Sequence, residues 1–223
     1  STTGTSQRAV VPTFAREPRY STNPIAFAAP AEDNDSFVLD MASSTVAVGK
    51  INIARRAEKP LPTGWAVNDQ GQPENDAAAA FESKPKRLTP LGGTRELGSH
   101  KGYGLAMMVE VLSSILTDAG VGGHDTETWE TGQYLNIGHF MLVIDPKRFG
   151  LAGAFEGRMD RLINMLHDTP PADPERPVLV PGDPEHAQMR RRLAEGIPMV
   201  PKLFDEIGEV AKRCGAEFIL GNS

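Results

Sequence analysis

The sequence has few of the side chains that build disulfide scaffolds or metal centres. Cys214 is the single cysteine, which excludes a disulfide within the chain and a metal cage made only of its own thiolates. The five histidines are too far apart for a short-spaced pair of metal ligands, so we expect no metal site. No apolar run reaches the roughly 18 residues that a membrane-spanning helix needs, and we expect no membrane partner.

Positive charge is also scarce. The chain has 23 Lys and Arg against 29 Asp and Glu, a formal charge of −6 at pH 7. This balance disfavours attraction to nucleic acid, which we do not expect as a partner. The chain starts at Ser1 without an initiator methionine or a basic and then apolar leader. We therefore expect a processed chain or a piece of a longer protein.

The apolar residues that are present predict both strands and helices. A chain of 223 residues, 39% of them hydrophobic, suits one large domain or two small ones. Apolar runs predict buried strands over residues 36–41 and 139–144. Helical spacing predicts helices over residues 77–81, 102–116, 152–167, 184–195 and 201–214. Apolar side chains nearly surround the helix at 102–116, so we expect it in the core.

The usual nucleotide and hydrolase motifs are missing. The sequence has no G-x-G-x-x-G after a predicted strand, no P-loop, no G-x-S-x-G elbow and no H-E-x-x-H. Rossmann dehydrogenases, P-loop enzymes and common hydrolases therefore lose support. Prolines crowd residues 169–184, and such a stiff connector is the best candidate for a domain boundary.

Three short stretches could bind a polar ligand. Residues 39–44 put Asp40 at the end of a strand, followed by small hydroxyl residues; the alternative is a strand end turning into a loop. Residues 99–104 place Lys101 just before two glycines at the start of a helix, where free N–H groups favour an anion; the alternative is a surface lysine with two glycines for tight packing. Residues 22–24 form a turn that enters a strand, which either helps to bind the ligand or is an ordinary turn.

Four other features favour structural roles. Glu110 lies within the apolar helix and is either a functional acid or, more commonly, a buried acid paired with Lys or Arg. We expect His139 to be structural, Arg190 to Arg192 to form a solvated face, and Cys214 to be a small core residue.

Taken in order, several strings resemble one family, the type 2 malate/L-lactate dehydrogenases. They cover residues 21–30, 39–47, 49–51, 64–67, 90–93, 100–105, 144–146 and 181–185. Each string is weak alone, but the ordered set is specific. The family also includes ureidoglycolate, sulfolactate and diketogulonate enzymes and the Δ1-piperideine-2-carboxylate reductases.

The resemblance implies hydride transfer between NAD or NADP and a small 2-hydroxy or 2-oxo acid. It implies an α/β fold in which a non-Rossmann nucleotide-binding domain has a largely antiparallel sheet flanked by helices. Residues 1–170 would form most of that domain, and residues 171–223 the connector and helices of a second domain. It also implies a cytoplasmic homodimer.

The resemblance assigns site residues by position. Six would line or lie near the cofactor, and one would lie near the substrate: Asp40, Met41, Ala42, Lys101, Asp183 and Glu185 for the cofactor, and Thr22 for the substrate. The reading depends on Asp40 and Lys101 converging on a single pocket. Lys50 stands where the imine-reducing members carry an acid, which favours hydroxy-acid oxidation.

The chain departs from the family at its front. The N-terminal portion that holds the histidines and arginine of proton transfer and carboxylate binding has no counterpart here, so we expect no catalytic residue in this chain. That portion would be a separate chain after cleavage or simply absent from this piece. Two alternatives stay open: a non-catalytic subunit or binding module of the same fold, and a cyclic imino acid reductase.

Overall fold

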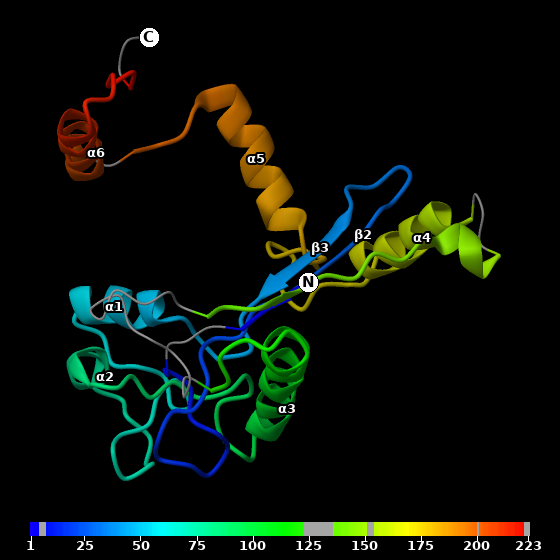
Figure 1. Cartoon of the computed structure of the whole chain (residues 1–223). Coiled ribbons are helices and arrows are strands. Elements are labelled where there is room, and N and C mark those ends of the chain that lie inside the picture. The colour runs from blue at the N-terminus through cyan, green and yellow to red at the C-terminus, as the bar shows by residue number, and fades with distance from the viewer. Residues whose placement is uncertain (5–7, 123–135, 151–153, 200, 221–223) are drawn as a thin grey trace.

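The computed structural model describes residues 1–4, 8–122, 136–150, 154–199 and 201–220. It is a mixed α/β chain with a small sheet and helices on either side of it (Figure 1). The strands are β1 (Thr2–Thr3), β2 (Ile25–Ala29), β3 (Phe37–Met41) and β4 (His139–Phe140). The helices are α1 (Val48–Arg56), α2 (Ala77–Glu82), α3 (Ser99–Glu110), α4 (Phe155–His167), α5 (Asp183–Glu195) and α6 (Pro201–Cys214), with a π-helical turn η1 (Val111–Ile115) and a 3-10 turn η3 (Pro146–Phe149).

The sheet has the strand order β3-β2-β1-β4, and every neighbouring pair is antiparallel. β2 and β3 form a hairpin that projects from the body of the molecule in Figure 1. Five residue pairs hold it, from Ile25 opposite Met41 to Ala29 opposite Phe37. The antiparallel arrangement that the family resemblance implied is confirmed by this sheet.

The core lies beneath α1 and α2, away from the hairpin. Its most deeply buried large side chains include Val10, Ile51 and Leu88. Asp76 caps α2 by accepting hydrogen bonds from the N–H groups at positions 78 and 79, which begins the helix that the sequence predicted. The guanidinium of Arg55 on α1 lies 4.6 Å from the ring of Phe81 on α2 and ties the two helices together.

Helix α3 shows that the prediction of a helix buried all round was wrong. The helix is buried on one face only, through Gly102, Ala106 and Val109, whereas Met107 and Met108 are exposed. The buried face is made of small residues because another backbone approaches there. A Cβ built on Gly102 would lie 2.4 Å from the backbone N and O of Leu91.

The prediction of a buried strand over residues 139–144 was also wrong, because only the first two residues form a strand and even His139 is exposed. β4 ends at Phe140, and residues 141–144 follow outside any strand with exposed side chains. The strand is short because its neighbour β1 pairs with it only through Thr2 and Thr3, so residues 141–144 have no strand beside them among the described pairs. The strand predicted at 36–41 is present as β3, but Val38 and Asp40 on it are exposed rather than buried.

The last two helices match their predicted bounds within one residue, and they lead away from the body (Figure 1). α5 has no buried residue and contacts the hairpin through polar groups. Arg190 lies 2.5 Å from the carboxylate of Asp35, and the ring of His186 lies 3.1 Å from the carbonyl of Ser36. Cys214, predicted as a core residue, is exposed because α6 carries it on a face that no described element covers. No helix among the described residues is both long and apolar enough to cross a membrane.

Candidate functional site

The turn at residues 22–24 is fixed to helix α3 by the side chain of Asn23. Asn23 is fully buried and adopts a left-handed backbone conformation with φ of 37°. Its Nδ2 donates to the carbonyl of Ala106 at 3.1 Å and to Oε1 of Glu110 at 2.9 Å. Its Oδ1 is buried without a partner among the described residues. The turn is therefore anchored from within the molecule.

Glu110 does not have the Lys or Arg partner that we expected. Among the described residues its carboxylate accepts hydrogen bonds from Asn23 and, at Oε2, from the N–H of Gly122 at 3.2 Å. Neutral donors thus satisfy an acid that is only 4% exposed, as burial of a carboxylate requires.

Tyr20 is a second titratable group near this turn. Its pKa is raised to about 12, chiefly by burial, then by a hydrogen bond with the hydroxyl of Tyr103, and then by nearby negative charge, including that of Glu110.

Ser43 joins the end of the hairpin to the same turn. The carbonyl of Thr22 accepts hydrogen bonds from the N–H of Ser43 at 2.8 Å and from its Oγ at 3.0 Å. The carbonyl of Ser43 in turn accepts one from the N–H of Leu91 at 2.8 Å. Leu91 packs directly on Gly102 of α3. Three stretches that are far apart in the sequence, around Thr22, Ser43 and Gly102, are therefore brought together.

Lys101 stands in the first turn of α3, beside this junction. Gly98 caps the helix with φ of 97°, and a Cβ there would lie 3.6 Å from the lysine side chain. The side chain of Lys101 is exposed. Two of the first N–H groups are already used, since Ser99 donates to Thr94 and Lys101 donates to Gly98. Positive charge at this helix start therefore comes from the Lys101 ammonium together with the helix dipole.

Three more of the residues predicted to line the cofactor site, Asp40, Met41 and Ala42, lie at or just after the end of β3. Asp40 is exposed and pairs across the hairpin with Ala26; Met41, opposite Ile25, and Ala42 are half-buried. Two cavities are described in the structure, and neither is lined by Asp40 or Lys101. Their convergence on one pocket stays a prediction, supported by the backbone links through Ser43 and Leu91.

Asp183 and Glu185 lie at the opposite end of β3. The carbonyl of Pro181 accepts a hydrogen bond from the N–H of Val38 at 3.0 Å, which sets the start of α5 beside the start of the strand. From Val38 to Met41 the strand extends about 10 Å. The residues predicted to contact the cofactor therefore form two groups separated along β3, an arrangement that suits an elongated ligand.

Asp183 is held by a histidine. Its Oδ2 lies 2.8 Å from Nε2 of His167 and accepts a hydrogen bond from the N–H of Val180 at 2.7 Å. Burial raises the pKa of Asp183, but these hydrogen bonds and the histidine outweigh it and leave the pKa below its usual range. The carboxylate is thus ionised and already partnered.

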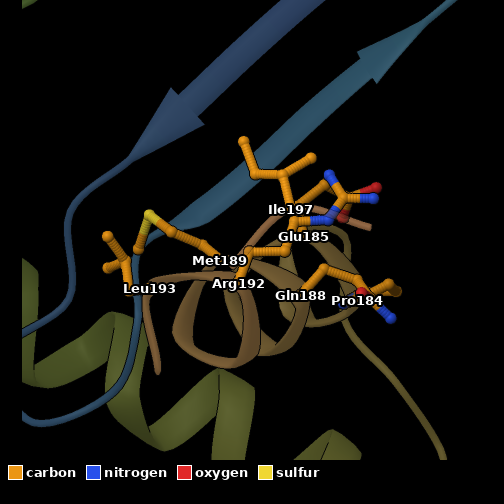
Figure 2. A pocket seen from close by; sticks show the side chains of 7 residues that line it. All are labelled: Pro184, Glu185, Gln188, Met189, Arg192, Leu193 and Ile197. Atoms are coloured by element: carbon orange, nitrogen blue, oxygen red, sulfur yellow. The ribbon is translucent and has the colours of Figure 1, made fainter. Parts of the chain in front are cut away.

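Glu185 lines a shallow cavity of about 520 Å³ on one side of α5 (Figure 2). Six of the seven lining residues come from α5, and the seventh, Ile197, follows the helix in the chain. The lining consists of Pro184, Glu185, Gln188, Met189, Arg192, Leu193 and Ile197. Met189, Leu193 and Ile197 are largely exposed, so this cavity is an apolar groove open to solvent.

Asp160 is an important residue that sequence reasoning missed. From α4 its carboxylate accepts hydrogen bonds from the N–H groups of Glu32, Asp33 and Asn34, and from the amide of Asn34. Hydrogen bonds from Asn34 first, opposed by burial and aided by Asp33 and Glu32, lower the pKa of Asp160 to about 2. The partners lie 126 to 128 residues away, so no local pattern signals them.

The structure also describes the other side chains for which we predicted structural roles. His139 lies 3.0 Å from the hydroxyl of Thr3 through its Nδ1, as expected of a structural histidine. Arg190 and Arg191 are exposed, as expected of a solvated face, and each has an acidic partner. Within the described ranges no group of three or more His, Cys, Asp or Glu side chains could hold a metal ion.

Comparison with known proteins identifies similar sequences over nearly the whole chain. The family described as malate/L-lactate dehydrogenase matches residues 1–208. A malate dehydrogenase from Pyrococcus horikoshii is 38% identical over 213 residues, which are 95% of this chain and 58% of that protein. A (2R)-3-sulfolactate dehydrogenase (NADP(+)) from Chromohalobacter salexigens is 32% identical over 200 residues, 89% of this chain and 55% of that protein.

The fold is similar to solved structures as well. A crystal structure of malate dehydrogenase from Entamoeba histolytica superposes with a TM-score of 0.88 at 27% identity, over 98% of this chain and 62% of that one. The chain thus spans little more than half the length of the relatives that it matches.

Proposed function

This chain belongs to the malate/L-lactate dehydrogenase family, and from that premise we propose that it supplies the cofactor-binding part of a dehydrogenase. The complete protein would move a hydride between the nicotinamide of NAD or NADP and C2 of a small 2-hydroxy or 2-oxo acid. The nicotinamide supplies the hydride chemistry when bound, and the protein supplies orientation. The printed names of the relatives, malate and sulfolactate dehydrogenases, support this reaction class.

The junction of Thr22, Ser43 and the start of α3 is the observation that carries the proposal. It links the two strings assigned to the cofactor, around Asp40 and Lys101, to the one assigned to the substrate. Lys101 offers an exposed cation, which suits a phosphate, and Asp40 offers an exposed carboxylate, which suits sugar hydroxyls. The buried Oδ1 of Asn23, which has no hydrogen-bond partner among the described residues, adds an acceptor beside Thr22. This donor set fits a nicotinamide dinucleotide.

Two buried or half-buried groups near this junction, Glu110 and Tyr20, are poorly suited to proton transfer. Glu110 is buried and partnered, and Tyr20 stays protonated at any pH at which the enzyme would work, because its pKa is about 12. We therefore assign the general acid or base to polypeptide outside this chain, and Thr22 to contact with the substrate.

We infer the substrate class from Lys50. This exposed residue of α1 occupies the position at which imine-reducing relatives would carry an acid. A cation there favours a hydroxy acid or keto acid over a cyclic imino acid. We further propose a boundary near residue 170, with the connector and α5 and α6 belonging to a second domain, and a homodimer as the working form.

Cofactor binding tests the proposal. The 223-residue chain is titrated with NADH and NADPH, and binding is followed by calorimetry and by nicotinamide fluorescence. We expect weak binding of at least one cofactor and no turnover of oxaloacetate or pyruvate. Lys101→Met should weaken that binding about tenfold, the size of one charge-assisted phosphate contact. Lys212→Met on α6 serves as the matched control and should change nothing.

The outcomes separate the proposal from its alternatives. If neither cofactor binds at millimolar concentration, the chain is a non-catalytic module of this fold. If Lys101→Met and Lys212→Met weaken binding equally, the assigned site is wrong. If the complete protein reduces a cyclic imino acid and leaves keto acids untouched, the inference from Lys50 fails.

A further inference from the structure

We propose that the sheet binds one further strand segment, an extended apolar stretch of the same polypeptide joined to the amino end of β1. This segment would run between β2 and residues 141–144, which are called here the exposed run. The proposal concerns assembly of the sheet and does not depend on the reaction that the complete protein performs.

The register of β1 gives the course of that segment. β1 lies between β2 and β4, with Thr2 opposite Ile25 on one side and opposite Phe140 on the other. Ser1 continues this pairing, because it exchanges two hydrogen bonds of 2.7 and 2.8 Å with Ala26. In an antiparallel ladder, each step back along β1 is one step forward along both neighbours.

The two neighbours therefore specify three further positions. The residue before Ser1 would lie between Phe27 and Leu142, the next between Ala28 and Val143, and the third between Ala29 and Ile144. Beyond the third, one neighbour reaches Pro30 and the other reaches Asp145 and Pro146. Proline has no N–H to donate, so the ladder ends on the two sides within one position of each other. A segment of this length would let β1 pair with all five residues of β2.

The exposed run has the composition of a covered strand. Met141, Leu142, Val143 and Ile144 are 57% to 93% exposed, although all four are large and apolar. Phe27 on the facing strand is 58% exposed. A continuous apolar run of this kind is typical of strands that are covered on both faces, and its exposure marks a contact surface.

The backbone N–H and C=O groups of β2 also point toward the position of the proposed segment. The two hydrogen bonds of Ala26 are directed at Ser1, so Ala28, two residues on, directs its N–H and C=O to the same side. Phe27 directs its groups to β3 instead. On the other neighbour, continuation of the alternation of β4 would put Leu142 and Ile144 in phase with Phe140 and facing the segment, and Val143 facing outward. Among the described residues no backbone hydrogen bond joins residues 27–29 to the exposed run.

The relatives contain polypeptide that can supply the segment. This chain spans 58% of the Pyrococcus horikoshii protein and 55% of the Chromohalobacter salexigens protein. A segment that is covalently joined to β1 loses little entropy on docking, because the register is already set at Ser1. A strand from a second copy would lack that advantage.

Amide hydrogen exchange tests the proposal on three forms of the protein. The first is the 223-residue chain, the second carries Val-Ile-Val before Ser1, and the third carries Val-Pro-Val as a matched apolar control. The proline stands opposite Ala28, where a ladder hydrogen bond is required. Exchange is measured residue by residue, and molecular mass is measured by light scattering.

We expect Val-Ile-Val to slow exchange at Ala28, Leu142 and Ile144 by about tenfold or more, as new ladder hydrogen bonds do. Phe27, bonded to β3, and Val143, facing outward, should not change. Val-Pro-Val should give little protection, and the mass should remain that of the unextended form.

Several outcomes would overturn the proposal. Equal protection at all five residues, or equal protection by the two extensions, would mean that the segment does not pair in this register. Slow exchange at Ala28, Leu142 and Ile144 in the unextended chain would mean that the edges are already covered. Protection that accompanies a doubled mass would assign the strand to a second copy instead.

Discussion

The carboxylate of Glu110 on α3 accepts a 2.9 Å hydrogen bond from the amide of Asn23, a residue 87 positions earlier in the chain. This buried bond determines how the turn that contains Thr22 meets the helix that begins beside Lys101. Because the bond lies beneath the candidate site and not within it, its role is to position the surrounding segments.

Removal of the Glu110 carboxylate should destabilise the fold. Glu110→Leu leaves the Gly122 N–H without its acceptor and removes one of the two acceptors of the Asn23 amide, at a cost of about 1–3 kcal/mol for each buried donor that stays unpaired. Glu209→Leu, which removes an exposed carboxylate of α6, is the control. Urea unfolding measures both. An unchanged free energy of unfolding in Glu110→Leu would mean that the pair contributes nothing.

Two substitutions of Asn23 separate its side-chain bonds from its backbone conformation. Asn23→Gly and Asn23→Ala both lose the bonds to Ala106 and Glu110, but only alanine is strained at φ of 37°. We expect Asn23→Ala to be less stable than Asn23→Gly by about 1–2 kcal/mol, the cost of a left-handed conformation. Equal midpoints of thermal unfolding for the two variants would contradict this.

Two glycines of α3 should respond in opposite directions to the same substitution. A Cβ at Gly102 would lie 2.4 Å from the backbone of Leu91, whereas a Cβ at Gly104 would meet nothing within 4 Å. Gly102→Ala should therefore destabilise the chain and loosen the contact beside Lys101. Gly104→Ala should stabilise it by about 0.5–1 kcal/mol through helix propensity. Thermal unfolding of the two variants provides the comparison, and a stabilised Gly102→Ala would show that α3 does not pack on Leu91.

The carboxylate of Asp160 should make the stability of the chain depend on acid pH. Its pKa is lowered to about 2 in the folded chain, whereas the unfolded value is 3.8. A lowered folded pKa stabilises the fold above the unfolded value, and the contribution is lost as the pH falls from 3.8 through about 2. The stability difference between the unaltered chain and Asp160→Asn should therefore shrink as the pH falls through this interval. A constant difference would contradict the role of the ionised carboxylate.

Local patterns predicted the elements that depend on local physics. Residues 201–214 form α6 as predicted because their apolar residues repeat at helical spacing. Helix α1 was not predicted: Gly49 and Lys50 interrupt its pattern, and the burial of Ile51 against α2 stabilises it. The exposed run was predicted as buried because its composition is that of a strand, while its exposure depends on the length of β1.

The candidate site was predictable only in part, for a similar reason. The strings around Thr22, Asp40 and Lys101 could be recognised one by one, and the structure links the segments that carry them. The residues that make the links, Ser43 and Asn23, have no sequence pattern of their own. Their partners are set by tertiary packing across many tens of residues.

The attachment of α5 to the hairpin has a consequence for how the molecule responds to salt. Arg190 bonds to Asp35 and lowers the pKa of that carboxyl, and His186 reaches Ser36, but no residue of α5 is buried. Ionic strength screens exposed charge pairs and leaves apolar packing largely intact. Added salt should thus loosen the contact between Arg190 and Asp35 and leave the core and the backbone bond between Val38 and Pro181 in place, so α5 would keep its attachment at its first turn only.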